Sequence, residues 1–328
     1  MHTVPLYAAL DLGTNNCRML VARPTARGFR VIDAFSRVTR LGEGLGASGR
    51  LSEVAMERTL DALEACVIKL ERNQVGRARL VATEACRRAV NGQEFTARIT
   101  KRTGLVPDII SPVEEAGLAL AGCASLLDPN IPWALVFDIG GGSTELVWVR
   151  NSAAGQTVMG VQSIPAGVVT LAEQWAGELG CGVGYAKVVE QIGNAFRPFE
   201  SLHTISSLMG GSMVQMLGTS GTVTTLGALH LGLERYERSQ VDGLDLSFSD
   251  IAAVTSRLAA MSADERAAHP CIGSERADLV LAGCAILEAV CRLWPLGRLR
   301  VADRGVREGV LLGMMRDDAR AGEAERAS

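Results

Sequence analysis

Residues 137–143, with the sequence FDIGGGS, and residues 10–16, with the sequence LDLGTNN, decide the fold of this chain. Each stretch follows a short apolar run and precedes another, which predicts a strand, an Asp-containing glycine turn and a second strand. The aligned positions are Asp11 with Asp138, Gly13 with Gly140, and Asn16 with Ser143. Glycine lets backbone N–H groups approach a phosphate closely, and a neighbouring Asp can hold a cation. The repeat predicts a phosphate clamped between two duplicated domains; two ordinary β-hairpins are the alternative.

The composition bounds the class of protein. The chain has 328 residues, of which 48% are hydrophobic, and this is enough to build the cores of two domains. The formal net charge of −3 argues against non-specific binding of nucleic acid. An anionic substrate must therefore meet local positive charge rather than a basic surface.

The cysteines and the N-terminus indicate a reducing compartment. Eight cysteines, Cys181 among them, form no C-x-x-C pair, and four scattered histidines make a zinc site a poor interpretation. The first five residues lack the charged region and apolar core of a signal peptide, and no apolar run reaches membrane-spanning length. We expect a cytoplasmic protein that does not insert into a membrane.

Strand and helix patterns alternate along both halves. The first half predicts a hairpin over 6–22, a strand over 29–35, a helix that begins after Ser52, a strand over 79–82 and a strand over 106–110. The second half repeats this order after 128–132, a stretch rich in Pro, Asp and Asn. We expect two α/β domains with mixed sheets, over 1–127 and 128–305, and a last helix over 306–328 that packs back on the first domain and frays from 316.

Six segments carry a resemblance to a known family. They are AALDLGTNNCRMLVA, ATEACRRAVN, SPVEEA, VFDIGGGSTELVW, GTSGTVTTLG and DRGVREGVLLG. Together they resemble the sugar kinase, Hsp70 and actin superfamily and, more narrowly, the exopolyphosphatase/guanosine pentaphosphate phosphohydrolase (Ppx/GppA) family in its short, two-domain form. The resemblance implies two duplicated actin-like (ribonuclease H-like) domains with an active-site cleft between them. Pro112 stands where the family usually has Gly.

Two adjacent acids, Glu114 and Glu115, have separate expected roles. Ser111 and Glu114 fit the S-x-x-E capping box, with Pro112 at the first helical position. Glu115 lies about 100° further round the helix and can face the substrate. It also matches the catalytic base of the family, which would deprotonate water. A solvated first-turn Glu is the alternative.

A magnesium ion is the expected cofactor, with Mn²⁺ and K⁺ as alternatives. Mg²⁺ binds through few carboxylates together with phosphate oxygens and water. Asp138 is the first candidate ligand, and Asp11 is the symmetric one. A turn Asp that caps its own backbone is the alternative for each.

The expected phosphate-binding residues follow the same loops. Backbone N–H groups and hydroxyls of the glycine loops suit non-bridging phosphate oxygens, and the family places basic residues near the phosphate path. The set is Thr14, Asn16, Arg87, Gly140, Gly141, Gly142, Ser143, Glu145, Gly218, Ser220, Gly221, Thr222, Arg276 and Arg307. Glu145 could equally be a solvent-facing strand residue, Ser220 an ordinary N-cap, and any of the arginines a surface residue.

The function implied by the resemblance is an exopolyphosphatase that releases orthophosphate from inorganic polyphosphate. Guanosine pentaphosphate (pppGpp) 5′-phosphohydrolase is the alternative, because both substrates present a terminal phosphoanhydride. A non-catalytic nucleotide-binding ATPase-fold sensor and a kinase are further alternatives. The expected partner is one of the two polyphosphates, without nucleic acid or membrane, and the resemblance also allows a homodimer.

Overall fold

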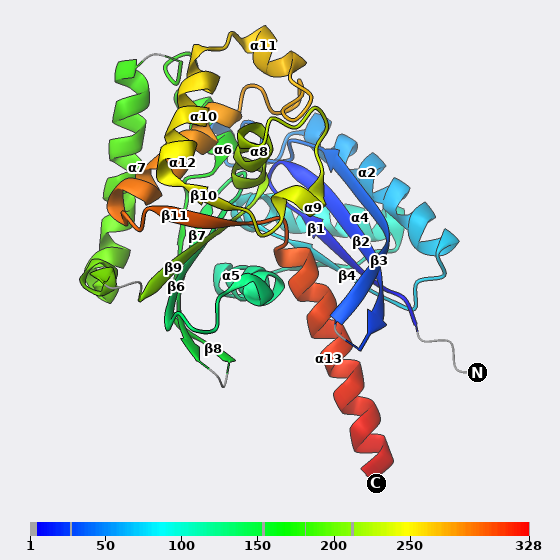
Figure 1. Ribbon diagram of the computed structural model, residues 1–328. Helices are drawn as coiled ribbons and strands as arrows, with labels where there is room; N and C mark the ends of the chain where they lie inside the picture. The colour runs from blue at the N-terminus through cyan, green and yellow to red at the C-terminus, as the bar shows by residue number, and fades with distance from the viewer. Residues whose placement is uncertain (1–4, 27, 153–154, 181, 211–212, 328) are drawn as a thin grey trace. The chain divides into compact units, whose positions relative to one another are not determined.

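The computed structural model describes residues 5–26, 28–152, 155–180, 182–210 and 213–327. The chain forms two compact units: unit 1 comprises Met1–Gly122 and Gly305–Ser328, and unit 2 comprises Cys123–Arg304. Each unit contains one mixed β-sheet with helices packed against it (Figure 1). The expected α/β class with duplicated mixed sheets is therefore confirmed.

Unit 1 is built on a five-stranded sheet in the order β3-β2-β1-β4-β5. Its strands are β1 (Tyr7–Leu12), β2 (Asn16–Thr25), β3 (Gly28–Val38), β4 (Arg77–Ala82) and β5 (Pro107–Ile109). Its helices are α1 (Leu45–Ser48), α2 (Glu53–Arg72), α3 (Glu84–Arg88), α4 (Gly92–Thr103), α5 (Pro112–Cys123) and α13 (Val306–Ala327). The three strands β1, β2 and β3 are antiparallel, whereas β4 and β5 run parallel to β1.

Alternation along β1 supplies two cores, one on each face of the sheet. Ala8, Leu10 and Leu12 belong to a cluster with α2 and α4, while Tyr7 and Ala9 pack with Val310 of α13. Successive strand residues point to opposite faces, so a strand that is apolar throughout is covered on both sides. The last helix thus packs against the sheet of unit 1.

The C-terminal segment differs from its expectation. The prediction that the chain frays from 316 is wrong for the described residues, because α13 continues as a helix to Ala327. The hydroxyl of Tyr7 donates to the carboxylate of Asp318 at 2.8 Å, and Arg77 ion-pairs with the same carboxylate. The Ala-rich sequence also has high helix propensity.

Unit 2 repeats the plan with a six-stranded sheet in the order β10-β11-β9-β6-β7-β8. Its strands are β6 (Trp133–Ile139), β7 (Thr144–Ser152), β8 (Gly155–Ile164), β9 (Val214–Thr219), β10 (Asp245–Ser247) and β11 (Arg298–Ala302). Its α-helices are α6 (Val168–Gln174), α7 (Gly182–His203), α8 (Gly221–His230), α9 (Arg238–Val241), α10 (Phe248–Ala260), α11 (Ala263–Ala268) and α12 (Val280–Leu293), and its short 3₁₀ helices are Ala124–Leu126 and Ile205–Leu208.

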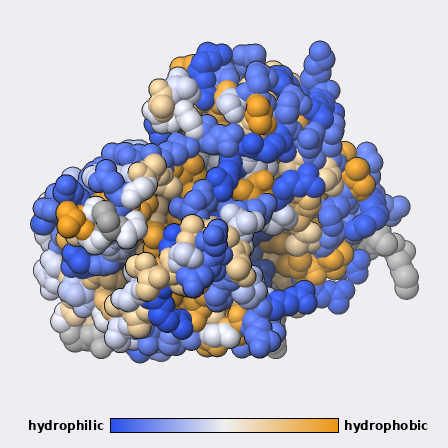
Figure 2. Space-filling model, turned by 90° about the horizontal axis from the view of Figure 1, so that it is seen from above, coloured by the Kyte–Doolittle hydropathy of each residue, from blue (hydrophilic) through white to orange (hydrophobic). Residues whose placement is uncertain are grey.

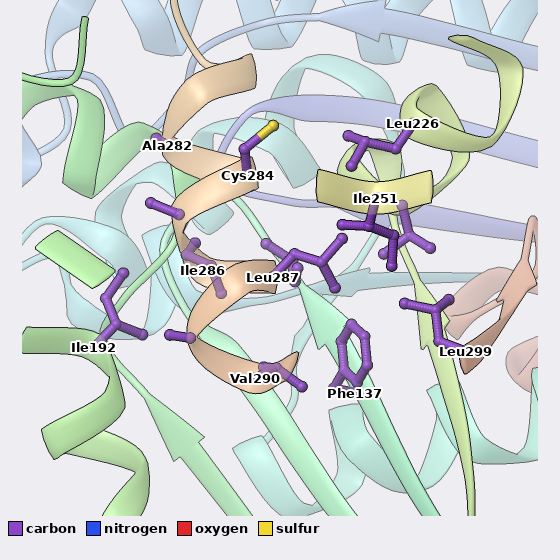
Figure 3. Packing of buried hydrophobic residues seen from close by; sticks show 14 of the residues in the cluster. Phe137, Ile192, Leu226, Ile251, Ala282, Cys284, Ile286, Leu287, Val290 and Leu299 are labelled. Atoms are coloured by element: carbon purple, nitrogen blue, oxygen red, sulfur yellow. The ribbon is translucent and has the colours of Figure 1, made fainter. Parts of the chain in front are cut away.

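The main core of unit 2 surrounds α12. Figure 3 shows Ile286, Leu287 and Val290 of this helix pointing toward neighbours that include Phe137 of β6 and Ile192 of α7. The face of α12 that carries Leu287 and Val290 packs over β6, where Phe137 is fully buried. This packing places the start of the glycine loop, directly after β6, on a rigid support.

The face in Figure 2 is largely hydrophilic, with hydrophobic residues in separate small groups. Among the described residues, no helix is long and apolar enough to cross a membrane. Among the described residues, six cysteines are buried and Cys291 is partly exposed; Cys181 and residues 1–4 lie outside the described residues.

Candidate functional site

The predicted residues of unit 2 meet at one edge of its sheet, where β6 and β9 end. Asp138 is in register with Thr219 of β9 on one side and with Glu145 of β7 on the other. Because β6 and β9 are parallel, the loops that follow them leave the sheet at the same edge. Ligands bind at this carboxyl edge in open α/β sheets.

The loop Gly140–Ser143 is held against the start of α6. The N–H of Gly140 donates to the carbonyl of Ser143 at 2.9 Å, closing the hairpin turn. The N–H groups of Val168 and Val169 donate to the carbonyls of Gly140 and Gly141 at 3.0 and 2.8 Å. These bonds fix the loop backbone from behind, which is the preorganisation that a phosphate-binding loop needs.

Gly167 is a functional candidate that the sequence analysis missed. A Cβ added at this glycine would lie 2.3 Å from the backbone of Gly141. Only glycine allows this close approach of the two backbones. Nothing in the local sequence marks the position, because the contact joins segments that are 26 residues apart.

Glu145 is almost completely buried, with a relative exposure of 2%. The solvent-facing alternative is therefore excluded. Its Oε1 accepts hydrogen bonds from the hydroxyls of Ser143 at 2.6 Å and Ser163 at 2.8 Å. Two donors on one oxygen hold a buried carboxylate in a single orientation. Ser163, on β8, is a second residue that the sequence analysis missed.

The loop after β9 has an unusual backbone at Ser220. This residue has φ 100° and ψ 176° and precedes α8 without making a side-chain cap. Its hydroxyl oxygen is buried and has no hydrogen-bond partner within the described part of the chain. Ser220 is thus the N-cap residue of α8 by position, but it lacks the side-chain hydrogen bond of an ordinary N-cap. A strained residue with an unsatisfied hydroxyl at a helix N-terminus suits an anion.

Two glycines allow tight packing around this second loop. A Cβ on Gly218 would lie 2.5 Å from the ring of Phe137, so β9 can approach β6 only with glycine there. A Cβ on Gly283 of α12 would lie 2.3 Å from the Thr222 hydroxyl. Thr222, at the start of α8, is thereby packed against the core of unit 2.

The matching turn in unit 1 has the same backbone bond. The N–H of Gly13 donates to the carbonyl of Asn16 at 2.9 Å, and the N–H of Gly42 donates to the carbonyl of Thr14 at 2.8 Å. The side-chain oxygens of Asn15 and Asn16 are buried and have no partner among the described residues. Buried polar atoms in native proteins are normally hydrogen-bonded, so this turn also offers groups to a ligand or water.

Asp11 of unit 1 has a different electrostatic setting from Asp138. It lies opposite Arg18 in the β1–β2 ladder. Burial raises the pKa of Asp11, the positive charges of Arg18 and Arg307 lower it, and Glu308 raises it. The structure thus brings the predicted residue Arg307 near Asp11.

Glu115 and Arg87 form an ion pair in unit 1. Arg87 Nη1 lies 3.1 Å from Glu115 Oε2, and Arg87 Nη2 lies 2.7 Å from Glu84 Oε2. The side chains of Arg87 and Glu115 are only 18% and 12% exposed, which excludes the surface and solvated alternatives for this pair. Glu84, 9% exposed, is a third residue that the sequence analysis missed.

Glu114 differs from its neighbour, as expected. The N–H of Glu114 donates to the hydroxyl of Ser111 at 3.1 Å, which confirms the serine half of the capping box. The carboxylate of Glu114 is 43% exposed and accepts a hydrogen bond from Arg79 at 2.7 Å. Glu114 is therefore a surface residue at the start of α5.

Arg276 lies in the turn before α12, where its carbonyl accepts from the N–H of Val280 at 3.1 Å. Its side chain is partly exposed. Its predicted contact with phosphate stays a prediction.

The candidate carboxylates for a magnesium ion have different surroundings in the two units. No group of three or more His, Cys, Asp or Glu side chains among the described residues forms a complete metal cage. Mg²⁺ does not require one, because it uses one or two carboxylates plus substrate phosphate and water. Asp138 and Glu145 supply two neighbouring carboxylates, whereas Asp11 already faces two arginines. The metal roles of Asp138 and Asp11 stay predictions.

Comparison with known proteins is consistent with this arrangement. The chain is 31% identical over 315 residues to guanosine-5′-triphosphate,3′-diphosphate pyrophosphatase of Aeromonas salmonicida, covering 96% of this chain but only 60% of that protein. It is 29% identical over 325 residues to exopolyphosphatase 2 of Mycobacterium tuberculosis, covering 94% and 98%. The crystal structure of the Ppx/GppA family member of Aquifex aeolicus matches with a TM-score of 0.78 at 28% identity, covering 96% and 98% of the two chains.

The sequence model of the Ppx/GppA phosphatase family matches residues 20–318, which include the glycine loop of unit 2, both segments around the Glu115–Arg87 pair and most of α13. With two duplicated mixed sheets and this match along nearly the whole chain, the protein belongs to the Ppx/GppA phosphatase family.

Proposed function

We propose that this chain is a Mg²⁺-dependent exopolyphosphatase that hydrolyses the terminal phosphoanhydride of inorganic polyphosphate. The observation that carries the proposal is the register of Asp138 with Glu145 at the sheet edge where two glycine loops emerge. Carboxylates for a cation and backbone N–H groups for phosphate oxygens then lie in one place. The name of the Mycobacterium relative supports the same substrate class.

The proposed step is an in-line attack of water on the terminal phosphorus. The water oxygen forms a new P–O bond while its proton passes to the carboxylate of Glu115. The bridging P–O bond breaks, its electron pair stays on the shortened chain, and orthophosphate leaves. Such phosphoryl transfer depends mainly on positioning and electrostatic stabilisation. Arg87, 3.1 Å from Glu115, supplies positive charge beside the base.

Each loop has a defined task in this proposal. The N–H groups of Gly141 and Gly142 and the unpartnered hydroxyl of Ser220 bind non-bridging oxygens. Asp138 would hold Mg²⁺, with Glu145 beside it in register and Asp11 as a second candidate ligand. When bound, the ion would neutralise charge that develops on the phosphoryl oxygens.

Hydrolysis of guanosine pentaphosphate is the second candidate, because the Aeromonas relative carries that activity in its name. Orthophosphate release should be compared on short polyphosphate, long polyphosphate and guanosine pentaphosphate, each with and without Mg²⁺. We expect the highest kcat/KM on polyphosphate and none without metal. A higher kcat/KM on guanosine pentaphosphate would replace the main proposal with the second. Absence of release from all three, with ATP binding retained, would favour the non-catalytic sensor.

A further inference from the structure

Arg87 is shared between two carboxylates and one carbonyl. Its Nη1 donates to Glu115 Oε2 at 3.1 Å and to the carbonyl of Ile110 at 2.7 Å, while its Nη2 donates to Glu84 Oε2 at 2.7 Å. One guanidinium therefore serves two nearly buried acids that come from different helices, α3 and α5. A single positive charge cannot neutralise both of them fully.

Glu84 has a second positive neighbour, Arg88. Arg88 Nε lies 3.7 Å from Glu84 Oε1, and the Arg88 side chain is 39% exposed. Arg87 therefore contacts one carboxylate oxygen of Glu84, and the partly exposed Arg88 lies near the other. The shorter contact of Arg87 is with Glu84, so its longer contact with Glu115 is the weaker of the two.

Other charged groups lie on the helix of Glu115 and on α13. On its own helix, Glu114 binds Arg79, which also binds Asp108 of β5. From α13, Glu308 lies beside Gly122, about two turns further along α5. The shared guanidinium of Arg87, with Glu84 and Arg88 behind it, is a charge in direct contact with Glu115.

We infer that Glu84 is a positioning residue that anchors Arg87 through Nη2, so that Nη1 can exchange Glu115 for a phosphate oxygen and leave Glu115 free to accept a proton from water. This inference rests on the proposed function. Glu84 and the Ile110 carbonyl keep the guanidinium in place during the exchange, so only one hydrogen bond has to change. Without the anchor, Arg87 would stay on Glu115 and compete with the substrate for that base.

The test uses two variants of the full chain, each of which removes one charge, with opposite expected effects. In Glu84→Gln, Arg87 loses its anchor and should bind Glu115 more closely, which favours the ionised form of Glu115. The loss of the negative charge of Glu84 also favours the ionised form. We expect KM for short polyphosphate to rise about tenfold, as for loss of a charged hydrogen bond. The acid limb of the kcat/KM profile should move to lower pH, because the ionised base is favoured.

In Arg88→Gln, Glu84 loses its second partner and should draw Arg87 away from Glu115. The acid limb should then move to higher pH. Glu114→Gln is the matched control: it removes an acid next to Glu115 that is paired with Arg79 on the surface, and it should leave the limb in place. Glu84→Asp keeps the charge and should restore most of the wild-type KM.

The outcomes separate this inference from the proposed function. If the wild-type chain releases no orthophosphate from any of the three substrates, the proposed function fails. If the wild type is active but the acid limb stays in place in both Glu84→Gln and Arg88→Gln, the positioning role is wrong. Should Glu84→Gln fail to fold, as judged by circular dichroism, the shift in Arg88→Gln and the KM of Glu84→Asp decide the matter.

Discussion

Asp138 and Glu145 lie directly opposite each other on the antiparallel strands β6 and β7. Two carboxylates at opposed positions repel each other and destabilise a sheet unless something compensates. At the corresponding positions of unit 1, Asp11 lies opposite Arg18, an attractive pair. The two copies of one hairpin therefore differ in charge: an acid faces an arginine in unit 1, whereas an acid faces another acid in unit 2.

Substitution of Glu115, the proposed base, should affect activity far more than substitution of its neighbour Glu114. Glu115→Gln keeps the shape of the side chain but removes the group that accepts the proton, so kcat should fall by about 10²–10⁴-fold. Binding of polyphosphate, measured by equilibrium titration, should change little. Glu114→Gln, which alters the exposed partner of Arg79, should retain nearly full activity. Equal losses in the two variants would contradict the assignment.

Replacing the proposed metal ligand should change the metal requirement. Asp138→Asn removes a negative charge, and we expect the Mg²⁺ concentration for half-maximal activity to rise by at least about tenfold, equivalent to about 1.4 kcal/mol. Asp11→Asn should have a smaller effect, because Arg18 and Arg307 already offset that carboxylate. Metal titrations of orthophosphate release provide the measurement. A wild-type titration curve for Asp138→Asn would remove this residue from the metal site.

The close approach of Gly167 to the backbone of Gly141 predicts that one added methyl group will strongly lower stability and activity. Gly167→Ala places a Cβ 2.3 Å from the Gly141 backbone. Moving the loop should lower the free energy of unfolding by about 1–3 kcal/mol and reduce activity strongly. Gly193→Ala is the matched change within α7, where no atom lies within 4 Å of the added Cβ. In that variant the free energy of unfolding should rise by about 0.5–1 kcal/mol, and kcat should be unchanged. Urea unfolding and phosphate release would show whether the contrast holds.

Asp33 of β3 should make the stability of unit 1 depend on pH. The hydrogen bond from Lys69 lowers the pKa of Asp33 to about 2, and Asn73 and the N–H of Ala34 act in the same direction. The carboxylate therefore stabilises the fold above its unfolded pKa of about 4, and this stabilisation is lost as the pH falls toward 2. After allowance for solvent screening, Asp33→Asn should lower the free energy of unfolding by about 1–2 kcal/mol at pH 7.

The difference between wild type and Asp33→Asn should vanish near pH 2, as followed by urea unfolding at several pH values. Asp61→Asn offers a comparison, since Asp61 is 60% exposed and pairs with Arg102 on the surface. It should change stability by less than about 0.5 kcal/mol. A loss for Asp33→Asn that is constant from pH 7 to pH 2 would show that its cause is not the charge.

Local sequence determined where helices begin and where the glycine turns of the hairpins form. The cap by Ser52 was predicted from a residue and its immediate neighbours, and the structure confirms it with a bond of 3.2 Å from the N–H of Ala55. The two strand–glycine turn–strand hairpins were likewise predicted, and both turns close with the same backbone bond. Such features depend on contacts within a few residues, where propensity, periodicity and turn chemistry are decisive.

Tertiary structure decided which distant residues support the site. Ser163 reaches Glu145 across 18 residues, Gly167 meets Gly141 across 26, and Glu84 shares Arg87 with Glu115 across 31. Ser163 and Gly167 have no local signature, because a serine or a glycine fits many environments. Glu84 precedes Arg87 by only three residues, but its connection to Glu115 through Arg87 depends on the packing of two helices. Strand register and helix packing bring them together only after folding, so the orientation of Glu145 and the charge beside Glu115 are properties of the folded units.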